Sequence, residues 1–326
     1  MARVYAELTA LMDLGDEPGW DFGGYPYGLE PLTLPYPAHE DVHDDQPSTA
    51  TLALACWRVA DQLQSLRQAA VPPPESPEKL DRFRWITGHQ ISFIAWRMAA
   101  QLLAEIDRGC QPTAATVAEI STYVDVYSAM LIYSGSCTSR RYHDHIRPSM
   151  QLHHPSFSGS WAPDYVPIRH LLRGRLEPLH QAPNSDQLRH AVDVNIAAHE
   201  WIAEKLVPDG VSLLRGTSQS AVHQGARLLN QLYDNYFMTN RGETSRSGIT
   251  AQLLRRVSAV VQDIQANGLT TDQEIAELPV DLRACARATC SILLDASRRS
   301  VGRPALVGLQ LARRHQAMGR TPARQL

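Results

Sequence analysis

The sequence predicts an all-α protein, and three observations support this fold class. Apolar residues recur at spacings of three and four over several long segments, helix-capping residues precede these segments, and alternating strand patterns are few. The chain has 326 residues, of which 44% are hydrophobic and 20% charged, which is ordinary for a globular protein with a sizeable core. We therefore expect roughly ten helices.

The chain divides into three parts. The first 48 residues are expected to form an irregular arm, because glycine, proline and tyrosine are concentrated there. Residues 49–70 have helical apolar spacing and end at the linker VPPPESP. We expect residues 49–312 to form one helical domain, and the basic residues 313–326 to form a flexible tail.

Local signals give the order of the helices. Ser76, Pro77 and Glu78 are typical of a helix start, and the helix that follows should run to Asp107 and stop at Gly109. The other expected helices are 116–133, 185–206 after a cap at Asn184, 221–237, 249–266 and one that begins at the capping box Thr271–Glu274. Residues 134–167, rich in Ser, Pro, His and Arg, are expected to form a long irregular segment, which is usually functional in a compact domain.

Charge and cysteine usage exclude several classes. A net charge of -3 gives no electrostatic reason to expect nucleic acid or an anionic membrane as a partner. No apolar run reaches membrane-spanning length, and the N-terminus does not have the pattern of a signal peptide. The five cysteines are scattered and never spaced as CxxC, so we expect a reducing, cytoplasmic location.

A histidine interrupts the apolar run RWITGHQISFIAW. At 3.6 residues per turn, His89 shares a stripe with Trp85, Phe93 and Trp96. This pattern predicts that the imidazole faces a pocket or the core. The alternative is a core histidine that is hydrogen-bonded to a backbone carbonyl.

A second histidine lies in LRHAVDVNIAAHEWIAEKL. Helical spacing places His199 at the centre of an apolar seam and His190 nearer an edge. The other members of the predicted seam are Leu188, Val192, Ile196, Ile202 and Leu206. A neutral imidazole aimed into an apolar cavity suits an axial haem ligand, although a core histidine remains the alternative for this helix alone.

The two helices together resemble a known superfamily. TGHQISFIAW resembles the THQxxELW hallmark of the tryptophan 2,3-dioxygenases, and His199 with the later RGTSQS resembles their second histidine helix and GTGGSSG loop. The ELW and the glycine pair are replaced here, so the chain resembles a divergent branch. The segments YPYGLEPLTLPYPAH and IRPSMQLHHPSFSG are most similar to the bacterial haem-dependent L-tyrosine hydroxylases of that superfamily.

The resemblance implies a tryptophan 2,3-dioxygenase-like helical bundle that encloses a haem. It also implies hydroxylation of L-tyrosine at the ring 3-position to L-DOPA, with hydrogen peroxide as oxidant, in antibiotic biosynthesis. Related dioxygenases are oligomers, so a homodimer or larger assembly is expected. A relative attaches haem covalently through HxxxC, but here no cysteine follows a candidate histidine at that spacing, so we expect non-covalent haem b.

The same resemblance implies residue roles. His199 would be the proximal iron ligand, and His89 the distal acid–base group, which ideally has a pKa near 7. Arg147 would hold the substrate carboxylate, although anchoring of its own loop is the alternative. Thr217 and Ser218 would contact the ammonium group or a haem propionate. The candidate pocket walls are Trp85, Phe93, Trp96 and Phe157.

Other functions remain open at this point. A tryptophan or indole oxygenase of the same superfamily, a non-catalytic haem-binding protein and a helical protein without haem all fit parts of the pattern. A mononuclear zinc or iron site built from four other histidines is a further alternative, although no suitably placed Glu or Cys completes the set. These histidines are His143, His145, His153 and His154.

Overall fold

The computed structural model is mainly helical, which confirms the all-α prediction. The structure describes residues 26–37, Cys56, Val59, Ala60, residues 71–175, 177–210, Leu213 and residues 225–301. Within this part of the chain, the regular β-structure is one parallel pair, strands β1 (Leu32–Leu34) and β2 (Thr239–Arg241). Most of the expected helix 49–70 and the whole basic tail lie outside the described residues.

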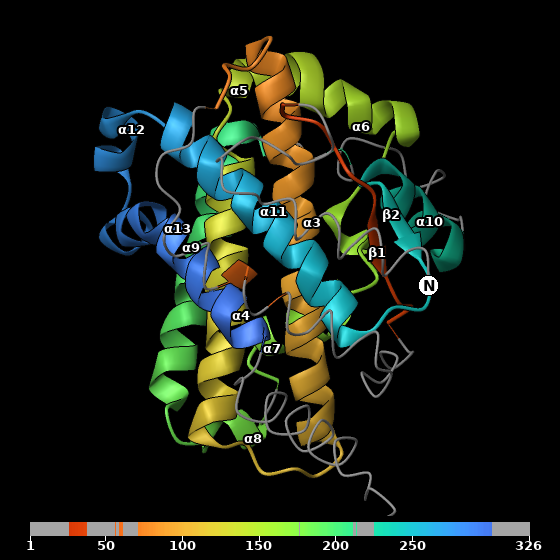
Figure 1. Cartoon of the computed structure of the whole chain (residues 1–326), viewed down its shortest axis with the longest axis vertical. Coiled ribbons are helices and arrows are strands. Elements are labelled where there is room, and N and C mark those ends of the chain that lie inside the picture. The colour runs from red at the N-terminus through yellow and green to blue at the C-terminus, as the bar shows by residue number, and fades with distance from the viewer. Residues whose placement is uncertain are drawn as a thin grey trace, which may run out of the picture.

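The longer helices form a bundle, with the short elements at its sides and ends (Figure 1). The longer helices are α3 (Pro77–Asp107), α4 (Ala114–Ser134), α7 (Tyr165–Leu172), α9 (Ser185–Leu206), α10 (Ala226–Tyr236), α11 (Arg246–Asn267) and α13 (Val280–Ser300). The short elements are α5 (Ser139–Arg141), the π-helical turn η2 (Tyr142–Ile146), α6 (Arg147–His153), the 3-10 turn η3 (Gly159–Trp161), α8 (Glu177–His180) and α12 (Asp272–Glu277).

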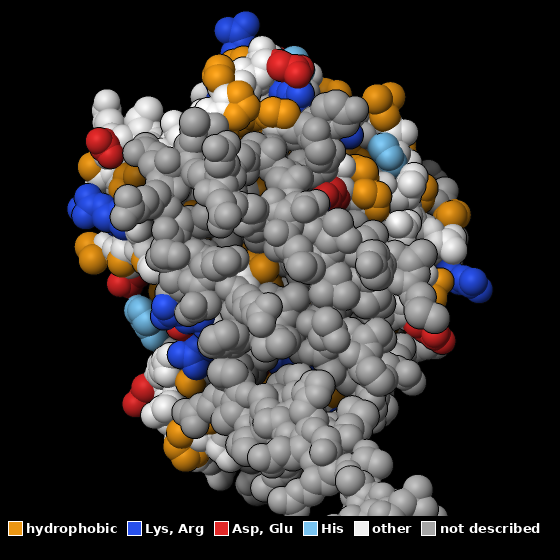
Figure 2. Space-filling model, in the orientation of Figure 1, with side chains coloured by type: hydrophobic (Ala, Val, Ile, Leu, Met, Phe, Trp, Pro, Cys, Tyr) orange, Lys and Arg blue, Asp and Glu red, His pale blue; other side chains and the backbone are white. Residues whose placement is uncertain are grey.

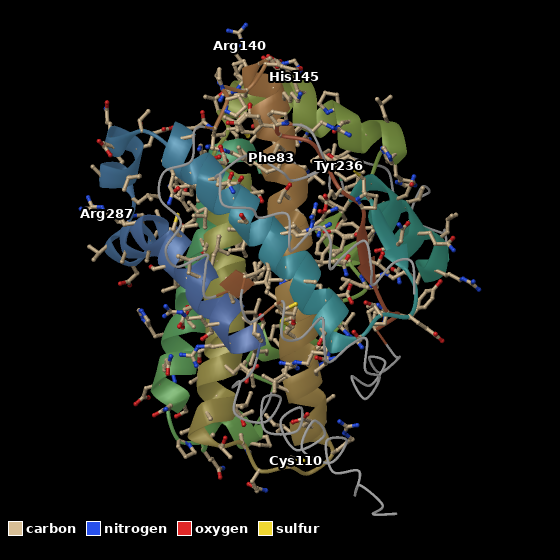
Figure 3. All side chains as sticks on the ribbon, in the orientation of Figure 1. Phe83, Cys110, Arg140, His145, Tyr236 and Arg287 are labelled. Atoms are coloured by element: carbon tan, nitrogen blue, oxygen red, sulfur yellow. The ribbon has the colours of Figure 1, made fainter. Side chains whose placement is uncertain are left out.

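Helix α3 runs the length of the bundle and has the ends that the sequence predicts. The Ser76 side chain accepts a hydrogen bond from the backbone N–H of Lys79, which satisfies a free donor of the first turn. Gly109 follows the helix with φ +98°, a backbone conformation that favours glycine. In Figure 3, Cys110 at this end lies opposite His145, which lies near the start of the helix.

Helix α4 lies at the centre of the bundle, where it packs against α3, α9 and α13 (Figure 1). Most of its residues are buried, which matches a sequence that is apolar on nearly every side. Its buried Ser128 accepts a hydrogen bond from the Asn195 amide of α9 at 3.0 Å. This bond satisfies the two polar groups inside an otherwise apolar contact.

A glycine allows α3 to approach α4 next to His89. A Cβ placed on Gly88 would lie 2.2 Å from the Ser134 hydroxyl and 3.1 Å from Cδ1 of Tyr133. Such distances are too short for a side chain without movement of its neighbours. Gly88 therefore sets the spacing of the two helices where His89 projects.

Gln90 joins three segments that lie far apart in the chain. Its amide nitrogen donates to the carbonyl oxygens of Glu30 and Phe237, at 3.0 and 2.9 Å. Its amide oxygen accepts from Nε of the buried Arg256 on α11 at 2.9 Å. A polar residue inside this apolar run is thus fully bonded and fixes the segment before β1 against α3 and α11.

Three expectations differ from the structure. The segment 134–167, predicted to be irregular, forms a series of short helical turns, since Thr138 and Ser158 cap two of them with their side chains. Leu32–Leu34 forms a strand within the arm that was expected to be irregular. The single helix expected from Thr271 onward is two helices, α12 and α13. Pro279 separates them, because proline cannot continue a helix from the preceding turn.

The described surface has no single-sign charged face in the view of Figure 2, where Lys and Arg side chains alternate with Asp and Glu around the edge. This mixture agrees with the small net charge of -3. Among the helices of the described residues, none has the length and hydropathy that a membrane span needs.

Candidate active site

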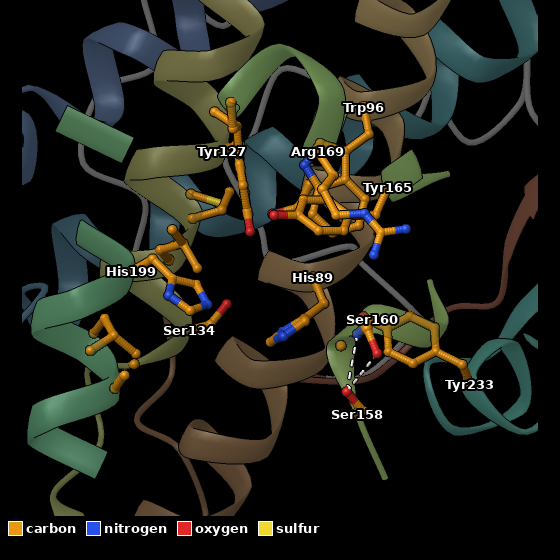
Figure 4. A pocket seen from close by; sticks show the side chains of 18 of the residues that line it. His89, Trp96, Tyr127, Ser134, Ser158, Ser160, Tyr165, Arg169, His199 and Tyr233 are labelled. Atoms are coloured by element: carbon orange, nitrogen blue, oxygen red, sulfur yellow. Dashed lines mark hydrogen bonds between the residues drawn. The ribbon is translucent and has the colours of Figure 1, made fainter. Parts of the chain in front are cut away.

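A cavity of about 540 Å³ lies among α3, α4, α7, α9 and the loop around Gly159. This size falls within the range of roughly 300–1,000 Å³ that is typical of small-molecule and cofactor sites. The lining is largely apolar and aromatic, with two histidines, two arginines and several serines among it. Figure 4 shows His89 and His199 pointing into the same space from opposite sides.

His89 is held in one orientation by its own helix and by two aromatic rings. Its Nδ1 lies 2.6 Å from the carbonyl oxygen of Trp85, one turn earlier on α3. Its ring stacks on Phe237 with centroids 4.5 Å apart, and the Trp85 ring lies tilted against it with centroids 4.4 Å apart. A carbonyl only accepts, so Nδ1 carries the proton in the neutral ring, and Nε2 is left with a lone pair.

Burial lowers the pKa of His89 to about 4, because the charged ring loses its hydration, and the hydrogen bond to Trp85 only partly offsets this loss. This value differs from the pKa near 7 that suits an acid–base group. The surroundings explain the difference, since three aromatic residues border the ring, and no carboxylate is among the causes of the shift. The imidazole is consequently neutral at physiological pH.

His199 projects from α9 toward the cavity, but not from the centre of an apolar seam. The buried residues of α9 are Leu188, Ala191, Val194, Asn195, Ala198 and Leu206. Ile196, which was assigned to the seam, is 41% exposed, so the predicted helix phase is wrong. Small residues such as Ala191 and Ala198 face α4, because they let the two helices approach closely. His199 lies beside this buried face, with Ile202 and Ala203 next to it on the cavity wall.

The aromatic residues that the sequence singled out separate into two layers. Trp85 and Trp96 line the cavity, whereas Phe93 and Phe157 are buried outside its lining. Both phenylalanines pack on Tyr233, which itself lines the cavity, with centroids 5.6 and 5.5 Å apart. The phenylalanines therefore support the wall rather than form its surface.

Arg147 begins α6 and is not among the lining residues of the cavity. Its charge acts on Tyr142, where it lowers the pKa of the phenol against a larger rise from burial. The arginines that line the cavity are Arg169 and Arg173. Sequence reasoning missed them, although the spacing of four from Tyr165 to Arg169 to Arg173 would place all three on one face of a helix.

The GT loop lies outside the described residues, so the predicted contacts of Thr217 and Ser218 stay predictions. Ser158, Gly159 and Ser160 form a polar part of the cavity lining instead. The Ser158 hydroxyl accepts a hydrogen bond from the backbone N–H of Ser160 at 3.2 Å, which fixes this turn. The sequence indicated a functional loop here, but not which residues reach the cavity.

The four clustered histidines have separate partners. His143 Nε2 bonds the carbonyl of Leu206 at 2.9 Å, and His145 faces Glu78. His153 bonds the carbonyl of Ser149, and the buried His154 accepts from the backbone and the side chain of Ser156. In the part of the chain that the structure describes, no group of three His, Cys, Asp or Glu side chains could hold a metal ion.

Comparison with known proteins adds one finding. No curated protein matches the chain. A family model does match part of it, from the segment after β1 into the first turns of α9. The matched part includes His89, Arg147, Arg169 and Arg173, and it ends before His199. Residues 38–191 are similar to the family described as SfmD 3-methyl-L-tyrosine peroxygenase.

Proposed function

We propose that this protein is a haem-dependent peroxygenase that hydroxylates L-tyrosine at the ring 3-position to L-DOPA in a biosynthetic pathway. The observation that carries the proposal is the pair of imidazoles, His89 on α3 and His199 on α9, that line one aromatic cavity. The family match over residues 38–191 supports an oxidoreductase that uses peroxide. The family's description also supports a phenolic amino acid as the substrate class.

The cavity residues fit a haem. The largely apolar lining, with Trp85 and Trp96 among it, suits a flat macrocycle, and an imidazole on each of two sides of the cavity could hold its iron. Arg169 and Arg173 suit carboxylate groups. Non-covalent haem b is part of the proposal, because no cysteine lies four residues after a candidate histidine in the sequence.

We assign the iron-binding role to His199 and the acid–base role to His89, as the resemblance implies. A haem bound here would supply a redox-active iron for oxygen-transfer chemistry. In the net reaction the O–O bond of hydrogen peroxide breaks, one oxygen enters the ring C–H bond of tyrosine, and the other leaves as water. The chain's own residues bind the reactants and move the proton.

His89 is the proton carrier in this proposal. Its Nε2 keeps a lone pair because Nδ1–H is donated to Trp85, so Nε2 can accept a proton from peroxide. The lowered pKa keeps this atom unprotonated at neutral pH. The lowered pKa also makes the protonated ring a strong acid, which favours return of the proton to the departing oxygen. Because burial disfavours the charged ring, His89 would hold the proton only briefly before returning it.

The expected homodimer is part of the proposal and rests on the resemblance alone. Light scattering at micromolar concentration tests it. A mass of two chains or more supports it, and a single-chain mass contradicts it.

The function is tested with purified protein that has been supplied with haem. We expect a Soret band, and we expect L-tyrosine with oxygen-labelled peroxide to give L-DOPA that carries the label. Reactions without peroxide, with L-tryptophan and with 3-methyl-L-tyrosine are the controls. A protein without a Soret band would exclude a haem enzyme, a Soret band without turnover would indicate a haem-binding protein, and turnover of tryptophan alone would indicate an indole oxygenase.

A further inference from the structure

Two arginines at one wall of the cavity have no role in the proton transfer proposed for His89. Helix α7 begins at Tyr165, and Arg169 follows one turn later. Arg173, one turn further, is the residue that caps the end of this helix. All three line the cavity, and Figure 4 shows Arg169 close to Tyr165 and Trp96.

The buried arginines of the described chain are paired with carboxylates or carbonyls. Arg84 pairs with Asp263 at 2.8 Å, and Arg241 pairs with Asp164 and Asp234 at 2.7 Å. No such ion pair joins Arg169 or Arg173 to a carboxylate of the described residues. Arg169, which is half-buried, and Arg173, which is exposed at the end of the helix, thus lie one helical turn apart at the lining of an aromatic cavity.

The surroundings of these arginines favour an anion. Arg169 is half-buried, and Trp96 and Tyr165 stand at the same wall with ring centroids 5.0 Å apart. Aromatic walls exclude water, so a charge pair formed there is screened less than one at the open surface. The ring of Tyr127 packs edge-on against Tyr165, with centroids 6.3 Å apart, and so supports the phenol beside Arg169.

We propose that Arg169 and Arg173 form a carboxylate-binding subsite of this cavity. A guanidinium binds a planar carboxylate through two parallel hydrogen bonds, which fixes the orientation of the ligand as well as its place. This inference rests on the proposed function, since that function supplies two carboxylate sources, the amino-acid substrate and the propionates of haem. It assigns the carboxylate to residues other than Arg147, which does not line the cavity.

The experiment compares ligands that differ only in their carboxylates. Haem-loaded protein is titrated with L-tyrosine and with tyramine, which lacks the carboxylate. Apoprotein is titrated with haemin and with haemin dimethyl ester, which lacks the charged propionates. The variants are Arg169→Met and Arg173→Met, with Arg147→Met as the competing assignment and Arg175→Met as an exposed control outside the cavity. Thermal melts of all four variants exclude a loss of folding.

We expect Arg169→Met or Arg173→Met to weaken one carboxylate ligand by roughly 10- to 100-fold, which is the usual range for a lost charged hydrogen bond. The matching ligand without carboxylates should bind as before, and Arg175→Met should change nothing. A loss confined to L-tyrosine identifies the substrate as the source, and a loss confined to haemin identifies the propionates.

Three results would overturn the subsite. If the wild type binds haem and tyrosine but neither variant discriminates between the paired ligands, the subsite is wrong while the proposed function stands. If Arg147→Met alone causes the loss, the carboxylate belongs to that arginine. If the wild type binds neither haem nor tyrosine, both proposals fall together.

Discussion

The imidazole of His89 and the carbonyl oxygen of Trp85 are joined by a hydrogen bond of 2.6 Å within a single helical turn. The bond does not depend on any distant element, because both groups belong to α3. It satisfies one polar atom of a ring that is otherwise surrounded by aromatic side chains, and it directs the other nitrogen away from the carbonyl. This bond is expected whether His89 is a core histidine or an acid–base group. The two hypotheses differ in the partner of Nε2, which is a reactant only if His89 is functional.

His89 should make the stability of the apoprotein depend on pH. Its pKa is about 4 in the fold and about 6.5 when unfolded, so the unfolded chain binds more protons between these values. The contribution of His89 to stability should therefore be complete above about pH 6.5 and should fall as the pH drops toward 4, by at most roughly 3.5 kcal/mol at about 1.4 kcal/mol per pKa unit.

Urea unfolding at pH 5 and pH 7 measures this effect in the wild type and in His89→Phe. Only the difference between the two pH values is compared, so a loss of packing common to both cancels. We expect the variant to show the smaller difference. An equal difference in both proteins would mean that the environment does not disfavour the charged ring.

His199→Ala should remove stoichiometric haem binding, or leave a weakly held haem whose spectrum added imidazole restores, because one axial bond largely fixes the iron. His190→Ala is the matched control, since it lies on the same helix, is exposed and does not line the cavity. Haem content per chain and the Soret spectrum are the measurements. Loss of haem from the His190 variant with retention in the His199 variant would reverse the assignment.

Gln90→Ala should destabilise the fold by roughly 1–3 kcal/mol, because it removes one buried hydrogen bond each from the Arg256 guanidinium and from the carbonyls of Glu30 and Phe237. Gln273→Ala removes the same amide from an exposed bond to Glu277 and should cost almost nothing. Chemical denaturation of the two variants gives the comparison. Equal stability of both would show that the bonds around Gln90 contribute little net energy.

Gly88→Ala should destabilise by about 1–3 kcal/mol, since the added methyl group meets Ser134 and Tyr133 of the neighbouring helix. Gly159→Ala is the control, because a Cβ there has no neighbour within 4 Å among the described residues. Thermal melting distinguishes them. A Gly88 variant as stable as the control would mean that the side chains of Ser134 and Tyr133 move aside at no cost.

Local signals in the sequence were sufficient where a structural feature depends on a few neighbouring residues. The start of α3 at Ser76 and the capping box of Thr271 and Glu274 are formed as predicted, because each is made within one turn. The same holds for the stripe that turns Trp85, His89 and Trp96 to one side of α3, since helical periodicity fixes it.

Features that depend on packing between distant segments could not be predicted in this way. The face of α9 was misjudged because the small residues Ala191 and Ala198 are buried, whereas the large Ile196 is exposed. Arg169 and Arg173 reach the cavity only because α7 packs against α3, and the segment that contains them looked irregular in the sequence. The three bonds of Gln90 join residues separated by 60, 147 and 166 positions, and no local pattern predicts such partners.

The central claim is that His89 transfers the peroxide proton, and the turnover number of a haem-loaded His89→Ala enzyme tests it most directly. The variant should keep its haem, since the proposed axial bond to His199 is intact, and it should bind L-tyrosine with modest loss. Its kcat at saturating tyrosine and peroxide should fall by ~10²–10⁴, the usual contribution of a positioned acid–base group. A His89→Ala enzyme with near-normal kcat would contradict the account and make His89 a core residue, and one that loses its haem would place His89 on the iron instead.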